Sequence, residues 1–248
     1  MERRTALFLP SMRNIDKQIF DIVSEFGKRT KAFKYKDLWA KYFIFLYLSG
    51  ARRNEPFMLN PTITKFISKK GITYYRIKRV NEKHFEGKNP RRVILEKPFK
   101  AWNTHEISLF EFLLNGNIQV TLDFKPLLDT NGTHPKRLEA FKLAYTKNDP
   151  ILRDIGSQLS YRFSKLFRTN MLTKENKIRY NEGIVPHQLR HWRVYNLRVE
   201  KNIPDHLVQL LLGWDNRMML DYYADVKRSI QEREAVSIYE SMEETNSS

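Results

Sequence analysis

The sequence contains no cysteine, and this absence excludes several kinds of chemistry at once. Disulfide bonds, zinc sites built on thiolates and cysteine nucleophiles all require the thiol group. A chain without disulfides suits a reducing compartment, so we expect a cytoplasmic protein. Any reactive chemistry then has to come from hydroxyl, carboxylate, imidazole and basic side chains.

Long hydrophobic runs are also missing. A helix needs about 20 mostly apolar residues to cross a bilayer, and no stretch of this chain has that character. The first segment, MERRTALFLPSMRN, has only a short apolar run before Pro10, which does not resemble a signal peptide. We therefore expect no association with a membrane.

Acidic residues are scarce relative to basic ones. The chain has 44 Lys and Arg against 28 Asp and Glu, which gives a formal net charge of +16. A charge of this size attracts polyanions, and nucleic acid is the first partner to consider, although a basic ribosome-associated or membrane-surface protein fits the charge alone. The last twenty residues, 229–248, hold five Glu and one Arg, so we do not expect this tail on a DNA-facing surface.

What is present is a chain of 248 residues, enough for one main domain. β-Branched and aromatic runs between Ile63 and Leu95, separated by turn residues, predict a small three-stranded antiparallel sheet, and 116–134 has the composition of a loop. The sequence therefore indicates an α+β, mainly helical fold. Apolar spacing predicts helices over 13–27, 35–49, 105–115, 151–170, 187–201, 204–212, 216–223 and 229–242.

Four short segments carry basic and nucleophilic residues in one order along the chain. They are Gly50-Ala-Arg-Arg-Asn-Glu55, a hairpin that contains lysines, Pro186-His-Gln-Leu-Arg-His191, and Leu212-Gly-Trp followed nine residues later by Tyr223. Together they resemble the catalytic domain of the tyrosine recombinase, or phage integrase, family over about residues 16–228. One such motif is weak evidence, but four in the family's order are specific.

The resemblance implies DNA strand transfer by transesterification. Tyr223 would attack a phosphodiester to give a 3′-phosphotyrosyl intermediate and a free 5′-hydroxyl, without ATP or another cofactor. The phosphorane-like state carries extra negative charge, which the guanidiniums of Arg52 and Arg190 are suited to bind. These charges can replace divalent ions, and no carboxylate cluster has metal-ligand spacing, so we expect no metal site.

Neighbouring residues compete for two of these roles. The family's spacing from Gly50 selects Arg52 over Arg53, and Glu55 would orient Arg52. Taken alone, Arg52 and Glu55 fit an ordinary surface ion pair three residues apart on a helix. Tyr222 and Tyr223 point about 100° apart on a helix, and the spacing from the tryptophan of Leu-Gly-Trp selects Tyr223.

The two histidines of the second basic motif receive different interpretations. His187 lies three residues before Arg190 on a helix that opens at Pro186, so both side chains can face one phosphate. His187 would transfer a proton or bind a phosphate oxygen, and a helix-capping role is the alternative. His191 is interpreted as a packed core residue. Trp214 stands where most of the family has histidine, and its indole can donate one hydrogen bond or simply pack, but it cannot transfer protons.

A lysine in the turn between the second and third strands would be the general acid for the leaving 5′-oxygen. Lys83 is the first choice and Lys88 the second, because Lys78 falls within a strand. Other basic residues are predicted to contact the DNA backbone, which adds affinity and salt dependence but little sequence preference. The predicted DNA-binding set is Arg53, Arg76, Lys78, Lys88, Arg91, Arg92, Arg162, Lys165 and Arg168.

The resemblance also suggests how the chain is organised. We divide it into an N-terminal extension (1–15), a catalytic domain (16–228) and a C-terminal helix with an acidic tail (229–248). Members of the family usually carry a separate core-binding domain before the catalytic one, and Arg52 comes too early to leave room for it. The chain is then either an excised catalytic domain or a minimal form. We expect double-stranded DNA as partner, self-association on it from dimer to tetramer, and a prokaryotic, viral or mobile-element origin.

Two other functions remain open at this point. A type IB topoisomerase resembles the recombinases in fold and chemistry but rotates one duplex instead of exchanging two. A non-catalytic DNA-binding protein would use the same basic surface without cleavage. The C-terminal apolar stripe of 229–242 fits docking on a neighbouring protomer, as in the family, and equally packing within one chain.

Overall fold

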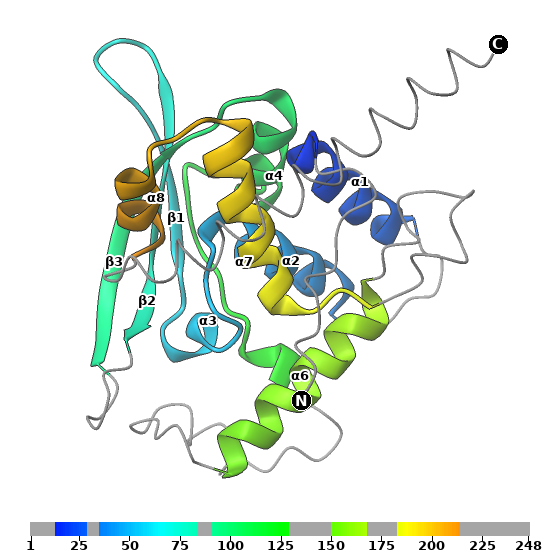
Figure 1. Cartoon of the computed structure of the whole chain (residues 1–248). Coiled ribbons are helices and arrows are strands. Elements are labelled where there is room, and N and C mark those ends of the chain that lie inside the picture. The colour runs from blue at the N-terminus through cyan, green and yellow to red at the C-terminus, as the bar shows by residue number, and fades with distance from the viewer. Residues whose placement is uncertain (1–12, 29–34, 84–90, 129–149, 168–182, 214–248) are drawn as a thin grey trace, which may run out of the picture.

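The structure, a computed structural model, describes residues 13–28, 35–83, 91–128, 150–167 and 183–213 (Figure 1). At 82–83, 91–93 and 150–157 only the backbone is described. Several sequence predictions therefore lie outside the described residues. These are the roles of Lys88, Arg168, Trp214 and Tyr223 and the helices over 216–223 and 229–242.

The helices predicted within the described ranges are present, most of them within two residues of the expected ends. They are α1 (Ile15–Gly27), α2 (Lys36–Ser49), α4 (Thr104–Leu114), α6 (Pro150–Leu166), α7 (Pro186–Tyr195) and α8 (Asp205–Leu212). A short α3 (Glu55–Met58) and a 3₁₀ turn (Lys125–Leu128) were not predicted. The expected helix over 187–201 is instead divided, because α7 ends at Tyr195 and continues as a π turn over Asn196–Glu200.

Helix α2 forms the centre of the domain. Almost every residue from Trp39 to Ser49 is buried, as expected for a helix that is apolar on all sides. It contacts α1, α4 and α7, and Figure 1 shows it surrounded by these helices. Aromatic rings join it to α6, since the Phe43 and Phe163 ring centroids lie 5.5 Å apart and those of Tyr42 and Phe163 5.9 Å apart. The position of α6 is thus set by core packing.

The sheet is antiparallel with the strand order β3-β2-β1-β4. Its strands are β1 (Thr62–Ile67), β2 (Thr73–Lys83), β3 (Arg91–Lys100) and β4 (Gln119–Thr121). The mainly helical α+β class is confirmed, but the predicted three-stranded sheet has a fourth strand where we expected loop. With three residues, β4 is too short to show an alternating pattern, and it forms only by pairing with Thr62–Thr64.

The pairing of β2 with β3 decides which side chains face the helices. Along β2, Tyr75, Ile77 and Arg79 are buried, whereas Arg76 and Lys78 between them are exposed. This period of two is the normal geometry of a strand with one covered face. The unusual member of the buried row is Arg79, which is 2% exposed. A charged side chain on the core face of a strand requires specific partners.

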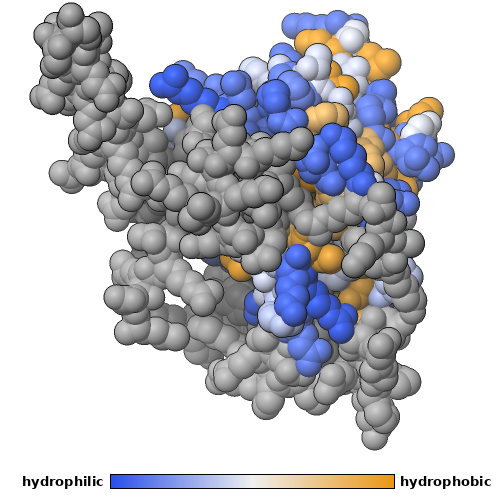
Figure 2. Space-filling model, turned by 90° about the vertical axis from the view of Figure 1, so that its right-hand side faces the viewer, coloured by the Kyte–Doolittle hydropathy of each residue, from blue (hydrophilic) through white to orange (hydrophobic). Residues whose placement is uncertain are grey.

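Large hydrophobic side chains are exposed at several separate positions of the described residues, among them Ile67, Ile118 and Leu210. Among those residues, no helix combines the length and apolar character needed to cross a membrane. Apolar and hydrophilic residues alternate over the face drawn in Figure 2.

Helix α3 and the first turn of α7 lie between the sheet and α6 (Figure 1), and the first and third predicted motifs meet in this region.

Candidate functional site

The site is built around the C-terminal end of α2. Gly50 ends this helix with φ of 59°, a left-handed conformation that glycine adopts without strain, as the sequence predicted. A second constraint comes from α8, because a Cβ atom on Gly50 would lie 2.6 Å from Leu212 Cδ2. Glycine is therefore required here by both backbone conformation and space. The ends of α2 and α8 are in close contact as a result.

Arg190 connects the two basic motifs. Helix α7 begins at Pro186, and Arg190, 1% exposed, lies one turn further along. Its Nη1 donates a 2.6 Å hydrogen bond to the carbonyl oxygen of Gly50. A cation at the C-terminal end of a helix is favourable, because the last carbonyl groups have no partner within the helix. Two segments 140 residues apart in sequence thus form one cluster.

Arg52 and Glu55 form the pair that the sequence predicted. The backbone N–H of Arg52 donates to Glu55 Oε2 at 2.8 Å, and Arg52 Nη1 lies 3.3 Å from Oε1. Glu55 is 0% exposed, while the side chain of Arg52 is 40% exposed. This is not the ordinary surface ion pair, since the carboxylate is buried and only the guanidinium reaches solvent. Arg52 is therefore held through its backbone by a buried carboxylate, while its side chain is partly exposed.

His187 lies at the start of α7 beside three arginines. Its side chain is exposed on one side, yet partial removal from water and the charges of Arg190, Arg52 and Arg53 lower its pKa to about 4. His187 is therefore neutral at pH 7 and can accept a proton. His187 lies three residues before Arg190 on α7, and Arg190 reaches the carbonyl oxygen of Gly50, two residues before Arg52. The three residues therefore lie in one region of the site.

His191 is partly buried, so its interpretation as a packed residue holds only in part. Its ring meets that of His187 edge to face, with 4.5 Å between the centroids. Burial, followed by the proximity of His187 and Arg190, lowers the pKa of His191 to about 3. Both histidines are therefore uncharged at neutral pH, and His191 supports the ring of His187.

Arg79 is a site residue that the sequence analysis missed. Its Nη1 lies 2.9 Å from Glu55 Oε2, so one carboxylate oxygen serves both Arg79 and the backbone of Arg52. Its Nη2 donates to the carbonyl oxygens of Ser49, at 3.2 Å, and Leu212, at 3.1 Å. The guanidinium therefore joins Glu55 to the last carbonyl groups of both α2 and α8. The only signal in the sequence was its place in the buried row of β2, which the predicted strand pattern could have revealed.

Asn81, two residues further along β2, was missed for the same reason. Its Nδ2 donates a 2.6 Å hydrogen bond to the carbonyl oxygen of Gly213. Gly213 ends α8 with φ of 71°, as predicted, and a Cβ atom there would lie 2.8 Å from Asn81 Nδ2. Residues 212 and 213 are thus held by two side chains of one strand, immediately before Trp214.

The lysine predicted as general acid is placed differently from the expectation. Lys83 is the last residue of β2, paired with Arg91 of β3, and does not lie in the turn. The strand is longer than its apolar pattern suggested because its partner β3 extends equally far. Arg91 and Arg92 are the first two residues of β3. Only the backbone of these three residues is described, so their predicted roles stay predictions.

The other predicted DNA-binding residues lie on several elements. Arg53 donates to Ser160 Oγ of α6 at 2.8 Å, and on the same helix Lys165 Nζ lies 4.3 Å from the centroid of the Tyr161 ring. Arg162, also on α6, is partly buried. On the exposed face of β2, Arg76 lies 3.7 Å from Glu96 and Lys78 is exposed. These cations therefore lie on α6 and on the exposed face of the sheet, and Arg53 links α6 to the site.

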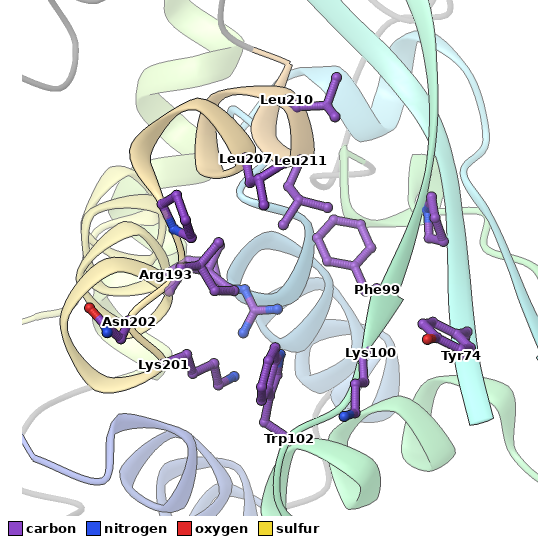
Figure 3. Close-up of a pocket in the computed structure, with 14 residues that line it drawn as sticks. Tyr74, Phe99, Lys100, Trp102, Arg193, Lys201, Asn202, Leu207, Leu210 and Leu211 are labelled. Atoms are coloured by element: carbon purple, nitrogen blue, oxygen red, sulfur yellow. The ribbon is translucent and has the colours of Figure 1, made fainter. Parts of the chain in front are cut away.

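A pocket of about 340 Å³ lies elsewhere, between the end of β3 and α8 (Figure 3). Its walls are largely apolar, with Phe99, Trp102 and the leucines of α8 facing one another. Arg193 and Lys201 also line it, but both are neutralised by buried carboxylates. Arg193 Nη1 lies 2.7 Å from Glu106, and Lys201 Nζ lies 2.7 Å from Glu106 and 3.1 Å from Asp16. These two cations stabilise the core.

Carboxylates near the basic cluster do not form a metal site. Among the described residues, no group of three or more His, Cys, Asp or Glu side chains is arranged to hold a metal ion. Glu55 is committed to Arg52 and Arg79. The described part of the site is therefore a cationic cluster with a neutral histidine, an arrangement that can bind and polarise a phosphate group.

No protein-family model and no curated protein matches this sequence. Two solved structures are similar in fold. One is the XerH site-specific recombinase bound to a palindromic difH substrate, with 19% identity, a TM-score of 0.45 and coverage of 94% of this chain and 54% of that one. The other is the protelomerase TelA covalently complexed with substrate DNA, with 15% identity, a TM-score of 0.39 and coverage of 84% and 56%. This chain spans about half the length of either protein.

Both structures have the tyrosine-recombinase fold, the family that the sequence motifs resemble. With TM-scores below 0.5, the likeness is a distant one. The functional proposal therefore rests on the residues of this chain.

Proposed function

We propose that this chain is a catalytic domain that breaks and rejoins DNA strands through a phosphotyrosine, as a site-specific recombinase of the tyrosine family does. The observation that carries the proposal is the convergence of Arg52, His187 and Arg190 at the end of α2. These are three of the six catalytic residues that the motif order selected, and they come from segments more than 130 residues apart. An ordinary basic surface would not require this particular set to meet.

In the proposed reaction the phenolic oxygen of Tyr223 attacks the phosphorus of one phosphodiester. A Tyr–O–P bond forms, the bond from phosphorus to the 5′-oxygen breaks, and the phosphate remains on the 3′ strand. Arg52 and Arg190 bind the non-bridging oxygens, whose negative charge is greatest in the transition state. The bond energy is kept in the phosphotyrosine, so rejoining to a 5′-hydroxyl requires no ATP.

Two protons have to move in each cleavage. An unperturbed tyrosine phenol has a pKa near 10, so the nucleophile has to lose its proton during attack. His187, neutral at pH 7, is the proposed acceptor. The leaving 5′-oxygen gains a proton, for which Lys83 is the proposed donor and Lys88 the second choice. Trp214 would donate one hydrogen bond or pack against the site. The rejoining step reverses both transfers.

The proposed partner is double-stranded DNA, bound largely through its phosphates. The net charge of +16 supports this, as do the exposed cations on β2 and α6. Exchange between two duplexes requires more than one active site, so we propose self-association on DNA from dimer to tetramer. A cytoplasmic location is part of the same proposal.

The experiment is detection of a covalent protein–DNA adduct on a denaturing gel. The probe is a pool of nicked duplexes with randomised sequence around the nick, incubated without added metal. Wild type is compared with Tyr223→Phe and Tyr222→Phe. We expect an adduct in wild type and Tyr222→Phe and none in Tyr223→Phe.

Other outcomes separate the alternatives. An adduct lost only in Tyr222→Phe would move the nucleophile by one residue. Relaxation of supercoiled plasmid without strand exchange would favour a type IB topoisomerase. DNA binding without any adduct from the pool would contradict the proposal and favour a non-catalytic DNA-binding protein.

A further inference from the structure

The guanidinium of Arg79 lies where three parts of the candidate site meet. Resting on the proposed function, we propose that Arg79 and Asn81 are positioning residues for the tyrosine nucleophile. They hold the backbone at Leu212 and Gly213 against the Arg52–Glu55 turn. The segment that carries Tyr223 then starts from a fixed point beside the arginines.

The first argument is the number of acceptors around Arg79. An ion pair with Glu55 alone would satisfy its charge, but the guanidinium also donates to the carbonyl oxygens of Ser49, Val80 and Leu212, at 3.1 to 3.2 Å. A planar fork of donors can bind several oxygens at once, whereas the single ammonium of a lysine binds them less completely. The ends of α2 and α8 are therefore tied to one rigid group.

The second argument is the route from Arg79 to Arg52. Glu55 Oε2 accepts from Arg79 Nη1 at 2.9 Å and from the backbone of Arg52 at 2.8 Å. A shift of Arg79 would therefore move the carboxylate that orients Arg52. The buried pair of Arg79 (2% exposed) and Glu55 (0% exposed) therefore connects Arg52, the proposed phosphate-binding residue, to the end of α8.

The third argument is that the C-terminal end of α8 is closely packed against β2 and β3. A Cβ atom on Gly213 would meet Asn81 Nδ2 at 2.8 Å and Leu95 Cδ2 at 3.0 Å. The hydrogen bond from Asn81 to Gly213 is 2.6 Å long. The backbone at Gly213 is thus held by close packing against Leu95 of β3 and by the hydrogen bond from Asn81 of β2. This fixed point lies ten residues before Tyr223.

The experiment uses the full chain and a nicked duplex recovered as an adduct from the pool described above. Asn81→Ala removes the hydrogen bond to Gly213, and Asn81→Asp replaces the donor with a carboxylate oxygen of nearly the same shape. The measurements are the first-order rate constant of adduct formation at saturating DNA, DNA affinity and the thermal midpoint. We expect the rate constant to fall at least about tenfold in both variants, with DNA affinity within about twofold of wild type.

Asn117→Ala is the matched control. Asn117 Nδ2 donates a 3.0 Å hydrogen bond to the carbonyl oxygen of Leu114, the last residue of α4, so it holds a different helix end. Because Asn117 is exposed whereas Asn81 is buried, this variant should lose less thermal stability, and its rate constant should not change. An equal fall of the rate constant in Asn81→Ala and Asn117→Ala would mean that any loss of stability slows the reaction, and it would overturn the proposal.

Arg79→Lys tests the other positioning residue. Lysine keeps a positive charge opposite Glu55 but cannot bind Glu55, Ser49 and Leu212 together. We expect a slower adduct step at unchanged DNA affinity. If this variant does not fold, the Asn81 variants still decide the matter.

Two different results would contradict the proposed function and the positioning role of Arg79 and Asn81. No adduct with wild type would contradict the proposed function and, with it, the positioning role. An adduct that forms in wild type and at the same rate in Asn81→Ala and Asn81→Asp would overturn the positioning role alone.

Discussion

The guanidinium of Arg190 donates a 2.6 Å hydrogen bond to the carbonyl oxygen of Gly50, and the residue that follows Gly50 by two is Arg52. This contact brings the first turn of α7 to the end of α2. Both positive charges thereby lie beside the neutral ring of His187, whose pKa they lower.

Arg190→Lys should abolish most of the adduct formation. Lysine keeps the charge, but it cannot bind Gly50 and two phosphate oxygens in one plane. Loss of one preorganised donor to a transition-state oxygen typically lowers a rate by about 10²- to 10³-fold. Single-turnover kinetics on a nicked duplex measures this. Arg198→Lys, at an exposed ion pair 2.6 Å from Asp205, is the control and should keep the wild-type rate.

Gly50→Ala should destabilise the fold more than Gly71→Ala. Both glycines have positive φ, 59° and 74°, so alanine is strained at either position. Only at Gly50 would the new Cβ atom meet another side chain, Leu212 Cδ2 at 2.6 Å, whereas nothing lies within 4 Å at Gly71. Overpacking adds about 1–3 kcal/mol, which urea unfolding of both variants would show. Equal costs for the two would argue against close packing of α8 on α2.

The thermal midpoint should fall as the pH is lowered from about 6.5 to 4. Unfolded histidines bind a proton near pH 6.5, but the pKa values of His187 and His191 in the folded chain are lowered to about 4 and about 3. Between these values the unfolded state holds more protons, so acid favours unfolding. The contribution of these two histidines to stability is therefore fully present above pH 6.5 and is lost on acidification.

Replacement of a histidine provides the check on this pH dependence. In His191→Gln the change of the midpoint between pH 7 and pH 4.5 should be smaller than in wild type, because one proton-linked group is gone. Scanning calorimetry at several pH values measures it. An unchanged profile would mean that the pKa of His191 is not lowered in the folded chain. Asp16 loses its charge at a lower pH than the histidines gain theirs in the unfolded state, because its pKa is lowered from the usual 3.8. Burial alone would raise this pKa, but the charges of Lys201 and Arg193 lower it by more.

Lys201→Met should cost far more stability than Lys17→Met. Lys201, 5% exposed, contacts the buried carboxylates of Asp16 and Glu106. Removal of one partner from a buried ionic group leaves uncompensated charge and typically costs about 3–5 kcal/mol. Lys17 forms an exposed pair with Asp21 at 2.6 Å, worth less than about 1 kcal/mol. Urea unfolding compares the two, and similar losses would contradict the buried network.

Much of this fold could be predicted because helix signals are local. Gly50 and Gly213 both follow apolar periodic segments, and both have the positive φ that ends a helix with glycine. The pairing of Arg52 with Glu55 was also predictable, since the two residues are three apart. The burial of Glu55 was not, because it depends on Arg79 from another element.

Roles that are defined by distant partners could not be predicted from the sequence. Arg79 lies 24 residues from Glu55 and 133 from Leu212 in the sequence. The alternation of β2 could place Arg79 on the buried face, opposite to Arg76, but it could not name these partners. The strand β4 exists only through its pairing with β1, and Lys83 became a strand residue because β3 continues opposite it. Register and pairing in a sheet are tertiary properties.

By itself the sequence determined the order of the motifs, the ends of the main helices and the excess of positive charge, because these depend on residue type and short spacing. Only the tertiary structure decided that Arg52, His187 and Arg190 meet at Gly50, and that Arg79 and Asn81 hold the end of α8 beside them. The physical reason is that burial and ion pairing depend on groups brought together by packing. A buried guanidinium is stable only where the whole fold supplies its acceptors.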